Sequence, residues 1–228
     1  MDDLEIITTS DGSHTLRNKQ LKETYHSIHG AVQESMHVFI RHGLEFFNDQ
    51  HQSNGISVLE VGFGTGLNAL LTLQYAVEKH INIRYTAIEP FPLEEEVWSK
   101  LNYGDPDKGN EHFKSMHEAE WNTEVSLIPG FSILKRKRTL QEVELNDVYD
   151  VIYFDAFGPS IQPELWEYAA LEKVVGVLKV NGVFVTYSAK GQLKRDLRLL
   201  GLAVETLAGP PGKNEMVRGR RGVAVLCR

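Results

Sequence analysis

The chain has 228 residues, of which 42% are hydrophobic and 24% are charged, and its net charge is −7. This length suits one large α/β domain with a full core, and the composition excludes a low-complexity chain. Its apolar runs are shorter than the roughly 20 residues of a membrane span, its first residues are acidic where a secretion signal is basic, and Cys227 has no second cysteine to pair with. The sequence therefore predicts a cytoplasmic protein without a membrane partner or an internal disulfide.

Residues 1–50 are expected to form an N-terminal hairpin and helix packed on the core. β-favouring residues flank Asp11-Gly12, a pair that is typical of a hairpin turn. Apolar residues then recur at helical spacing, which predicts one buried helix face. That face comprises Val32, Met36, Phe39, Ile40, Leu44 and Phe47.

Residues 51–228 are expected to form the main domain, and the whole chain is treated as one domain. An apolar strand over 55–61 leads through a glycine-rich turn into a long helix, and a second strand covers 84–89. Two helical pieces are predicted between 94 and 122, strands at 125–130 and 150–155, and a helix that begins at Pro163. Strands at 182–189, 202–208 and 221–227 follow, with a basic helix near 190–200. Alternating strands and helices predict an α/β fold with a doubly wound, mostly parallel sheet.

Charge is distributed unevenly along this acidic chain. Residues 185–228 contain nine Lys/Arg and three Asp/Glu, so they carry +6 and the preceding residues carry −13. A second basic run covers residues 135–138. Such segments permit a local phosphate-binding face, and solvated helix faces or tails are an equally good interpretation.

The glycine-rich turn has the pattern G-x-G-x-G at Gly62, Gly64 and Gly66. Small residues there let the backbone turn tightly and approach a ligand closely. Glu60 precedes the turn, and a carboxylate at that place repels a pyrophosphate but attracts the positive end of S-adenosylmethionine. Glu89 ends the next strand, where a carboxylate can accept both ribose hydroxyls. This pattern favours S-adenosylmethionine over a nicotinamide or flavin cofactor, or over a turn without ligand.

Several segments together resemble one family, the methyltransferase half of the bacterial bifunctional enzyme that completes 5-methylaminomethyl-2-thiouridine at the tRNA wobble position. The pattern E-x-GFGTGLN matches residues 60–68, and the strand ending E-x-FPL matches residues 89–93. A pattern D-G/A-F-x-P-x-x-x-P-x-x-W matches residues 155–166. Weaker patterns match Tyr25, Ser27, Glu34, Ser35, Val38 and Phe39 near the start, and Gly209, Lys213, Glu215 and Met216 near the end.

The resemblance implies the class I S-adenosylmethionine-dependent methyltransferase fold and N-methylation of 5-aminomethyl(-2-thio)uridine in tRNA. It implies a cofactor site made of Glu60, Gly62, Phe63, Gly64, Thr65, Gly66, Asn68, Glu89, Pro90, Asp155 and Ala156. The candidate substrate contacts are Tyr25, Glu34, Phe157, Pro159, Tyr187, Lys190 and Lys213. The relatives tend to carry an acidic residue after the glycine of the fourth-strand loop, whereas Phe131 follows Gly130 here, so the resemblance assigns no adenine contact at Gly130-Phe131. The relatives continue into a flavin-dependent oxidase domain, so only methyl transfer is expected of these residues, and a separate oxidase of unknown identity is a candidate partner.

Asp155 is the candidate catalytic residue. It ends an apolar strand, and open α/β sheets bind their ligands beyond the carboxyl ends of strands. Aspartate also caps helices, but Asp155 precedes Pro163 by eight positions, which is too far to cap the predicted helix. Methylation of an amine needs an acceptor that orients the nitrogen and helps to remove its proton, and Asp155 suits that role. Aromatic residues nearby, among them Tyr25, Phe63 and Tyr187, suit stacking on a splayed base.

The remaining patterns, of histidine and tryptophan, predict no further functional site. The pairs His26/His29 and His112/His117 lack the further ligands of a metal site, so no metal is expected. Trp166 is expected to anchor its helix to the core. The alternatives are a small-molecule amine methyl- or aminopropyltransferase and a non-catalytic module that binds the cofactor.

Overall fold

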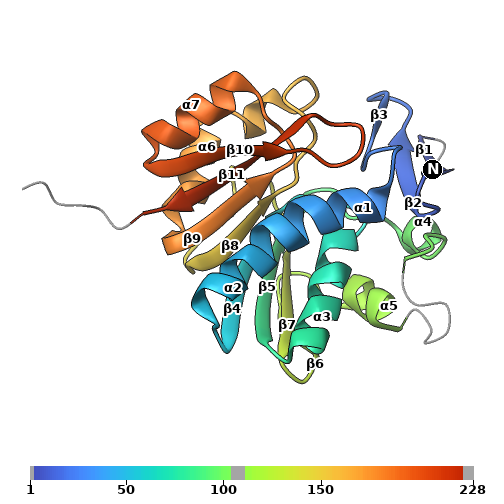
Figure 1. Ribbon diagram of the computed structural model, residues 1–228. Helices are drawn as coiled ribbons and strands as arrows, with labels where there is room; N and C mark the ends of the chain where they lie inside the picture. Colours follow the sequence, from blue (N-terminus) through green and yellow to red (C-terminus); the bar gives the residue numbers. More distant parts are fainter. Residues whose placement is uncertain (1–2, 104–110, 223–228) are drawn as a thin grey trace, which may run out of the picture.

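The computed structural model describes residues 3–103 and 111–222, and its centre is an eight-stranded sheet in the order β10-β11-β9-β8-β4-β5-β7-β6 (Figure 1). Its strands are β4 (Gly55–Val61), β5 (Asn82–Ile88), β6 (Glu124–Ile128), β7 (Phe131–Arg136), β8 (Tyr149–Phe154), β9 (Leu178–Thr186), β10 (Leu202–Ala208) and β11 (Glu215–Arg221). The five central strands run parallel, whereas β6, β10 and β11 pair antiparallel. The predicted mostly parallel α/β sheet is confirmed.

Helices cover both faces of this sheet. On one face lie α1 (Ala31–Ser35), the π-helical segment η1 (Met36–Glu45), α2 (Phe46–His51), α3 (Leu67–Lys79) and α5 (Glu111–Glu118), whereas the opposite face carries α6 (Tyr168–Gly176) and α7 (Gly191–Leu199). Adjacent strand residues alternate between two cores: Tyr153 packs with Phe39, and Phe154 packs with Trp166. The strands are buried on both faces, as parallel sheets require.

The N-terminal helix departs from the predicted period. Phe39, Ile40, Leu44 and Phe47 are buried as predicted. A π-helix has more residues per turn than an α-helix, so residues 36–45 add further positions to this buried face. Val38 and Gly43 are buried there, whereas Val32 and Met36 are only half-buried. A Cβ on Gly43 would lie 2.9 Å from Val185 Cγ2, so the glycine lets the helix approach the sheet closely.

A small three-stranded sheet precedes that helix, made of β1 (Leu4–Thr8), β2 (His14–Asn18) and β3 (Glu23–Thr24). The hairpin turn predicted at Asp11-Gly12 is confirmed, within a connection that covers residues 9–13. Asp11 accepts hydrogen bonds from the Thr9 hydroxyl (2.7 Å) and from the backbone N–H of Gln33 (2.9 Å). The turn is therefore tied to the start of the N-terminal helix.

Two local predictions need correction. Residues 131–136 form strand β7, which the sequence interpretation missed, and the basic run begins inside it. The helix expected at Pro163 is a single 3-10 turn, η2 (Pro163–Leu165), followed by α6 from Tyr168. The two helical pieces predicted between 94 and 122 are present as α4 (Glu95–Trp98) and α5, each shorter than expected. The last described strand is Glu215–Arg221, and most of the strand expected at 221–227, with Cys227, lies outside the described residues.

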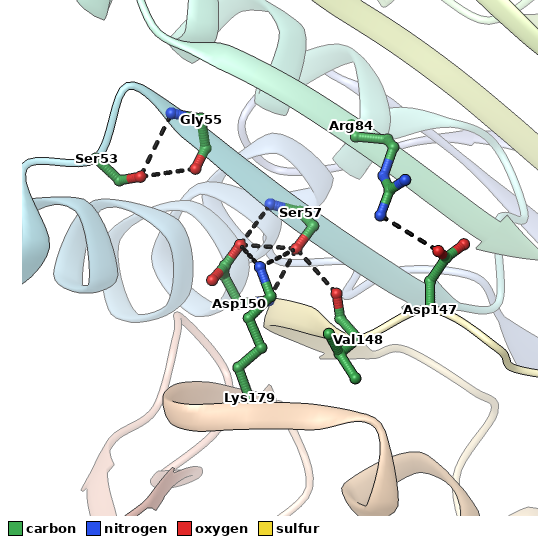
Figure 2. Close-up of polar contacts among 8 residues, drawn as sticks. All are labelled: Ser53, Gly55, Ser57, Arg84, Asp147, Val148, Asp150 and Lys179. Atoms are coloured by element: carbon green, nitrogen blue, oxygen red, sulfur yellow. Dashed lines mark hydrogen bonds and ion pairs between the residues drawn. The ribbon is translucent and has the colours of Figure 1, made fainter.

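A polar cluster joins three strands at the edge of the sheet where β4 begins (Figure 2). Asp150 Oδ2 accepts hydrogen bonds from the Ser57 hydroxyl (2.7 Å) and from Lys179 Nζ (2.9 Å). A cavity of about 440 Å³ lies there, and these three side chains bind one another at its wall. The cluster thus cross-links β4, β8 and β9.

Within the residues described, none of the helices has the length and apolar character that crossing a bilayer demands.

Candidate active site

A cavity of about 730 Å³ lies at the opposite edge, where the parallel strands β4, β5 and β8 end. Open α/β sheets bind ligands at this edge. The N-terminal segment, the glycine loop and the chain after β8 all contribute to the wall. The predicted site residues that line it are Tyr25, Glu34, Gly62, Phe63, Gly64, Thr65, Asn68, Glu89, Pro90, Asp155, Ala156, Phe157, Tyr187 and Lys213.

The glycine loop runs close to its neighbours. Gly62 has a φ of 94°, and a Cβ there would lie 2.7 Å from the carbonyl oxygen of Asp155. Gly66 has a φ of 76°, and its Cβ would meet the His117 ring at 3.0 Å. Only glycine suits these positive φ values at such spacing. The loop therefore brings the start of α3 against the end of β8.

Glu89 holds the glycine loop from the neighbouring strand. Its carboxylate accepts hydrogen bonds from the backbone N–H groups of Gly64 (3.0 Å) and Phe91 (2.9 Å). Burial raises the pKa of Glu89, and these two bonds oppose that rise. Each carboxylate oxygen keeps a further lone pair, so the side chain can still accept ribose hydroxyls at the cavity wall.

Asn68, in the first turn of α3, connects two of the predicted acidic residues. Its Nδ2 donates to Asp155 Oδ2 (2.8 Å) and to Glu60 Oε1 (2.9 Å). Burial raises the pKa of Asp155 well above its usual value, and the nearby Glu34 carboxylate raises it further. Burial likewise raises the pKa of Glu60. Both carboxyls are thus poised to take up a proton more readily than exposed ones.

Buried polar atoms without partners surround the same loop. Among the described residues, Glu60 Oε2, Asn68 Oδ1 and Thr65 Oγ1 are buried and make no hydrogen bond. Native structures rarely leave such groups unsatisfied, so Asn68 Oδ1 and Thr65 Oγ1, whose residues line the cavity, indicate a ligand there, whereas Glu60 Oε2 lies behind Asn68 with the Tyr85 hydroxyl nearby. All three are acceptors, and two belong to acidic or amide groups. The set fits a cofactor with a positively charged amino-acid end, such as S-adenosylmethionine.

The chain after β8 is fixed by two side chains. Trp166 Nε1 donates to the Phe157 carbonyl (2.7 Å), and Gln162 Oε1 accepts from the Phe157 N–H (3.1 Å). Trp166 is buried against Phe154, as expected of an anchor. Gln162, and not Asp155, precedes η2, and Asp155 makes no capping bond to it. Asp155 therefore faces the cavity instead of capping a helix.

A second group of predicted residues meets on the other side of Asp155. Glu34 accepts hydrogen bonds from Lys213 Nζ (2.5 Å) and from the Ser27 N–H (2.7 Å). The Lys213 ammonium lies 3.8 Å from the centre of the Tyr187 ring, and the Tyr187 hydroxyl donates to the Ala156 carbonyl (2.8 Å). These contacts join the first and last parts of the chain beside the candidate catalytic carboxylate.

Tyr25 and Phe157 close the cavity from opposite sides. Their rings meet edge to face with centroids 5.0 Å apart. Tyr25 also packs on Gly64, where a Cβ would lie 3.2 Å from its ring. Burial raises the pKa of Tyr25 to about 12, so its hydroxyl stays protonated at neutral pH. The pair forms an apolar wall suited to a flat ring.

Four predicted site residues do not line the cavity. Glu60 is fully buried and reaches the cavity only through Asn68, and Gly66 lies under the His117 ring. Pro159 and Lys190 lie outside the lining, and Lys190 is exposed at the start of α7. Contacts of these two residues with a large substrate remain predictions.

Residues 130–135 do not line the cavity, whereas Lys137 and Arg138 are exposed after β7. Gly130-Phe131 lies in the turn between the antiparallel strands β6 and β7, at the edge opposite the site, so adenine contacts there are excluded. Within the basic run, Lys135 is fully buried: its Nζ donates to the His117 carbonyl (2.6 Å) and lies 4.5 Å from the Trp121 ring centre. Burial lowers its pKa to about 8. Lys135 therefore cannot bind phosphate at the surface.

The sequence interpretation also missed residues that line the cavity. Leu140 and Gln141 follow β7 at the edge of the sheet where the cavity lies, so these residues line it and Gly130-Phe131 does not. Recognising β7 from the alternation in FSILKR would have revealed them. His26 and Ser27 also line the cavity; His26 lies within hydrogen-bonding distance of Thr15 Oγ1 through Nδ1 (3.2 Å).

Comparison with known proteins agrees with this geometry. Residues 111–222 match the model of a family described as S-adenosyl-L-methionine-dependent methyltransferase. This part of the chain is similar to that family. The match includes β8 and Asp155. The cofactor expected from the glycine loop is the one that the family uses, and the enzyme class expected from the sequence is confirmed.

Similarity to individual proteins extends over most of the chain. The tRNA 5-methylaminomethyl-2-thiouridine biosynthesis bifunctional protein MnmC of Methylobacillus flagellatus is 26% identical over 221 residues, which cover 87% of this chain and 32% of that protein. The protein of the same name from Leptospira interrogans is 28% identical, with 89% and 33% covered. The chain thus spans about a third of the length of these relatives. The family resemblance expected from the sequence is confirmed.

Solved structures confirm the class I methyltransferase fold. The crystal structure of MnmC2 from Aquifex aeolicus superimposes with a TM-score of 0.79 at 26% identity, covering 95% of this methyltransferase and 70% of that chain. The sugar N-methyltransferase KedS8 of a Streptoalloteichus species superimposes with a TM-score of 0.50 at 12% identity, covering 84% and 87%, which supports the fold alone.

Proposed function

We propose that the chain uses S-adenosylmethionine to methylate the amine of 5-aminomethyl(-2-thio)uridine at the wobble position of tRNA, giving 5-methylaminomethyl(-2-thio)uridine. The observation that carries the proposal is the half-buried Asp155 carboxylate, held by Asn68 beside the glycine loop and facing an aromatic-walled cavity. The curated relatives named above support the choice of substrate, because their names give this modification of tRNA.

The residues divide the work as follows. The glycine loop, Asn68 and Glu89 hold the cofactor, which supplies an electrophilic methyl group when bound. Asp155 accepts a hydrogen bond from the substrate nitrogen, orients its lone pair and takes its proton, which its raised pKa favours. Positioning of the two reactants supplies most of the rate enhancement. Tyr25 and Phe157, whose rings contact each other edge to face, form the apolar wall against which the pyrimidine packs.

Contacts to the rest of the tRNA belong to the proposal as well. The exposed Lys190, at the start of α7, and the exposed Lys137 and Arg138, after β7, follow strands that end at the cavity edge, so they suit contacts to phosphates that flank the flipped base. An oxidase acting before the methyl transfer is the expected partner, since the resemblance pairs the two activities.

The test is transfer of labelled methyl from S-adenosylmethionine to tRNA isolated from cells that lack this last methylation. Label in the wobble nucleoside after digestion supports the proposal. Free polyamines and small alkylamines serve as competing substrates. Transfer to them without transfer to the tRNA would favour a small-molecule amine methyltransferase. Propylamine transfer from decarboxylated S-adenosylmethionine would favour the aminopropyltransferase alternative. Binding of the cofactor without transfer to any of them would indicate a non-catalytic module.

A further inference from the structure

The Lys213 ammonium occupies a cage inside the active-site cavity. It pairs with Glu34 Oε1 and lies over the Tyr187 ring, and both contacts are close. The Glu34 side chain is 6% exposed and that of Lys213 is 33% exposed. Asp155 lies near enough that the Glu34 and Lys213 charges change its pKa in opposite directions. A carboxylate and an aromatic face around one cation are the usual means of binding an alkylammonium group.

The walls of this cage are fixed by the fold. Glu34 lies in α1, and the Ser27 N–H holds its second oxygen. Tyr187 directly follows β9, and its hydroxyl is bonded to the Ala156 carbonyl. These bonds hold the carboxylate and the ring in place without any help from Lys213. The cage therefore persists when its occupant changes.

The occupant, by contrast, comes from a surface turn. Lys213 lies between β10 and β11, beside Gly212, whose φ is 85°. The turn is closed by its own backbone bonds, from Lys213 N to Pro210 O (2.9 Å) and from Gly209 N to Asn214 O (3.0 Å). In Figure 1 this turn reaches toward α1. The long lysine side chain can rotate away while these backbone bonds remain.

A displacement keeps the charges in balance. A buried carboxylate without a cation is costly, so Glu34 favours a positive partner in the free protein, in the complex with the substrate ammonium before its proton passes to Asp155, and in the complex with the methylated product, which is again an ammonium. The aminomethyl group of the proposed substrate is a primary alkylammonium at neutral pH, the same chemical group as the end of a lysine. Its entry compensates Glu34 as Lys213 leaves. It also brings the nitrogen beside Asp155, which accepts its proton.

We propose that Glu34, Tyr187 and Asp155 form a subsite for primary alkylammonium groups, and that Lys213 fills this subsite until the substrate amine displaces it. This inference rests on the proposed function for the identity of the natural amine. In the free protein, Lys213 therefore competes with the substrate amine for this subsite. This competition also explains why a lysine lies in a cavity that must receive a cation.

The test is binding of n-propylammonium to the Lys213→Ala protein, because this ion replaces the atoms that the substitution removes. Thermal unfolding is followed at constant ionic strength, with sodium chloride, tetramethylammonium and 1-propanol as controls. We expect Lys213→Ala to lower the Tm and n-propylammonium to restore it, with binding at least tenfold tighter than to the wild type. Lys194→Ala is the matched control, because Lys194 pairs with Glu215 of the same hairpin outside the cavity; its Tm should show no such rescue.

Glu34→Gln combined with Lys213→Ala should abolish the binding. Equal binding to wild type and Lys213→Ala, or rescue that survives Glu34→Gln, would overturn the proposal. If Lys213→Ala does not fold, the wild type is labelled with acetic anhydride and the ratio of Lys213 to Lys194 labelling is measured, because n-propylamine also consumes the reagent; n-propylammonium should raise this ratio, and an unchanged ratio overturns the subsite. Ammonium binding without methylation of tRNA would reject only the tRNA substrate, whereas methylation of tRNA without ammonium binding would reject only the subsite.

Discussion

Asn68 Nδ2 lies 2.8 Å from Asp155 Oδ2, and the same nitrogen donates to Glu60 Oε1. An amide nitrogen carries two hydrogens, so these two bonds use all of its donors. One side chain therefore orients the carboxylate beside the glycine loop and the candidate proton acceptor together. The proposed cofactor site and the proposed amine site therefore share one hydrogen-bond donor, in the first turn of α3.

Replacing Asn68 with alanine should impair both sites. Loss of the donor frees two buried carboxylates that repel each other, and we expect cofactor affinity and kcat each to fall by about 10- to 100-fold, as for other groups that orient a binding residue. Calorimetric titration with S-adenosylhomocysteine measures the first quantity, and methyl transfer measures the second. Asn48→Ala is the control, since that amide donates to the Tyr75 hydroxyl away from the cavity. A change in kcat alone would contradict the connection.

Asp155→Asn should separate catalysis from stability. The amide oxygen can still accept from Asn68 but cannot take a proton, so we expect turnover to fall by about 10²- to 10⁴-fold. Cofactor affinity should stay within about threefold. The raised pKa shows that burial disfavours the ionised carboxylate, so the Tm near neutral pH should stay equal or rise. Loss of cofactor binding in parallel with turnover would reassign Asp155 to the cofactor site.

The pH profile of the wild type should reveal the same carboxyl. Because its pKa is raised, Asp155 becomes protonated at a higher pH than an exposed aspartate, and a protonated acid cannot accept the substrate proton. We expect kcat/KM to decrease as the pH falls through this raised pKa. Cofactor binding measured at each pH provides the control. An acid limb at the ordinary pKa of aspartate would contradict the assignment.

Gly62→Ala should damage the glycine loop. The positive φ and the 2.7 Å approach to the Asp155 carbonyl leave no room for a Cβ, so we expect a loss of about 1–3 kcal/mol of stability and weak cofactor binding. Chemical denaturation measures the stability. Gly176→Ala is the matched control: nothing lies within 4 Å of its Cβ position in α6, and alanine should stabilise that helix by about 0.5–1 kcal/mol. Equal effects at both glycines would refute the steric argument.

Acid should destabilise the fold through two buried histidines. Burial lowers the pKa of His26 and of His117 to about 4, whereas an unfolded histidine titrates near 6.5. The unfolded state therefore binds more protons between these values, so stability is lost as the pH falls from 6.5 toward 4. Each histidine contributes about 1.4 kcal/mol per pH unit in that window. Urea unfolding at several pH values measures the slope, which should decrease in His26→Gln. An unchanged slope would mean that His26 does not contribute.

Local patterns predicted the parts of the site that local sequence determines. The glycine loop, Glu89 and Asp155 each lie where a strand ends, and a strand and its turn are visible within a few residues. The sequence could not show that Glu34 pairs with Lys213, because that contact joins residues 179 positions apart. The sequence also could not show which loop lines the cavity next to β5. The answer depends on which of β6 and β7 runs parallel to β5.

The position of Lys135 in the basic run was unpredicted for a related reason. Charged residues were interpreted as exposed, yet β7 alternates buried and half-exposed positions, and Lys135 occupies a buried one. The π-helical segment likewise buries Val38 and Gly43, which the 3.6-residue period had not assigned to the buried face. In both places the tertiary contacts determined which side chains are buried.

The contact between Glu34 and Lys213 also bears on how the chain matures during translation. The carboxylate is made early, and its cationic partner follows 179 residues later. A nascent chain that lacks the turn before β11 has no complete amine cage, and its Glu34 carboxylate has no lysine to compensate it. Burial of α1 in its final position is therefore favoured only once the last hairpin has left the ribosome. Closure of the active site therefore waits for the β10–β11 hairpin that carries Lys213.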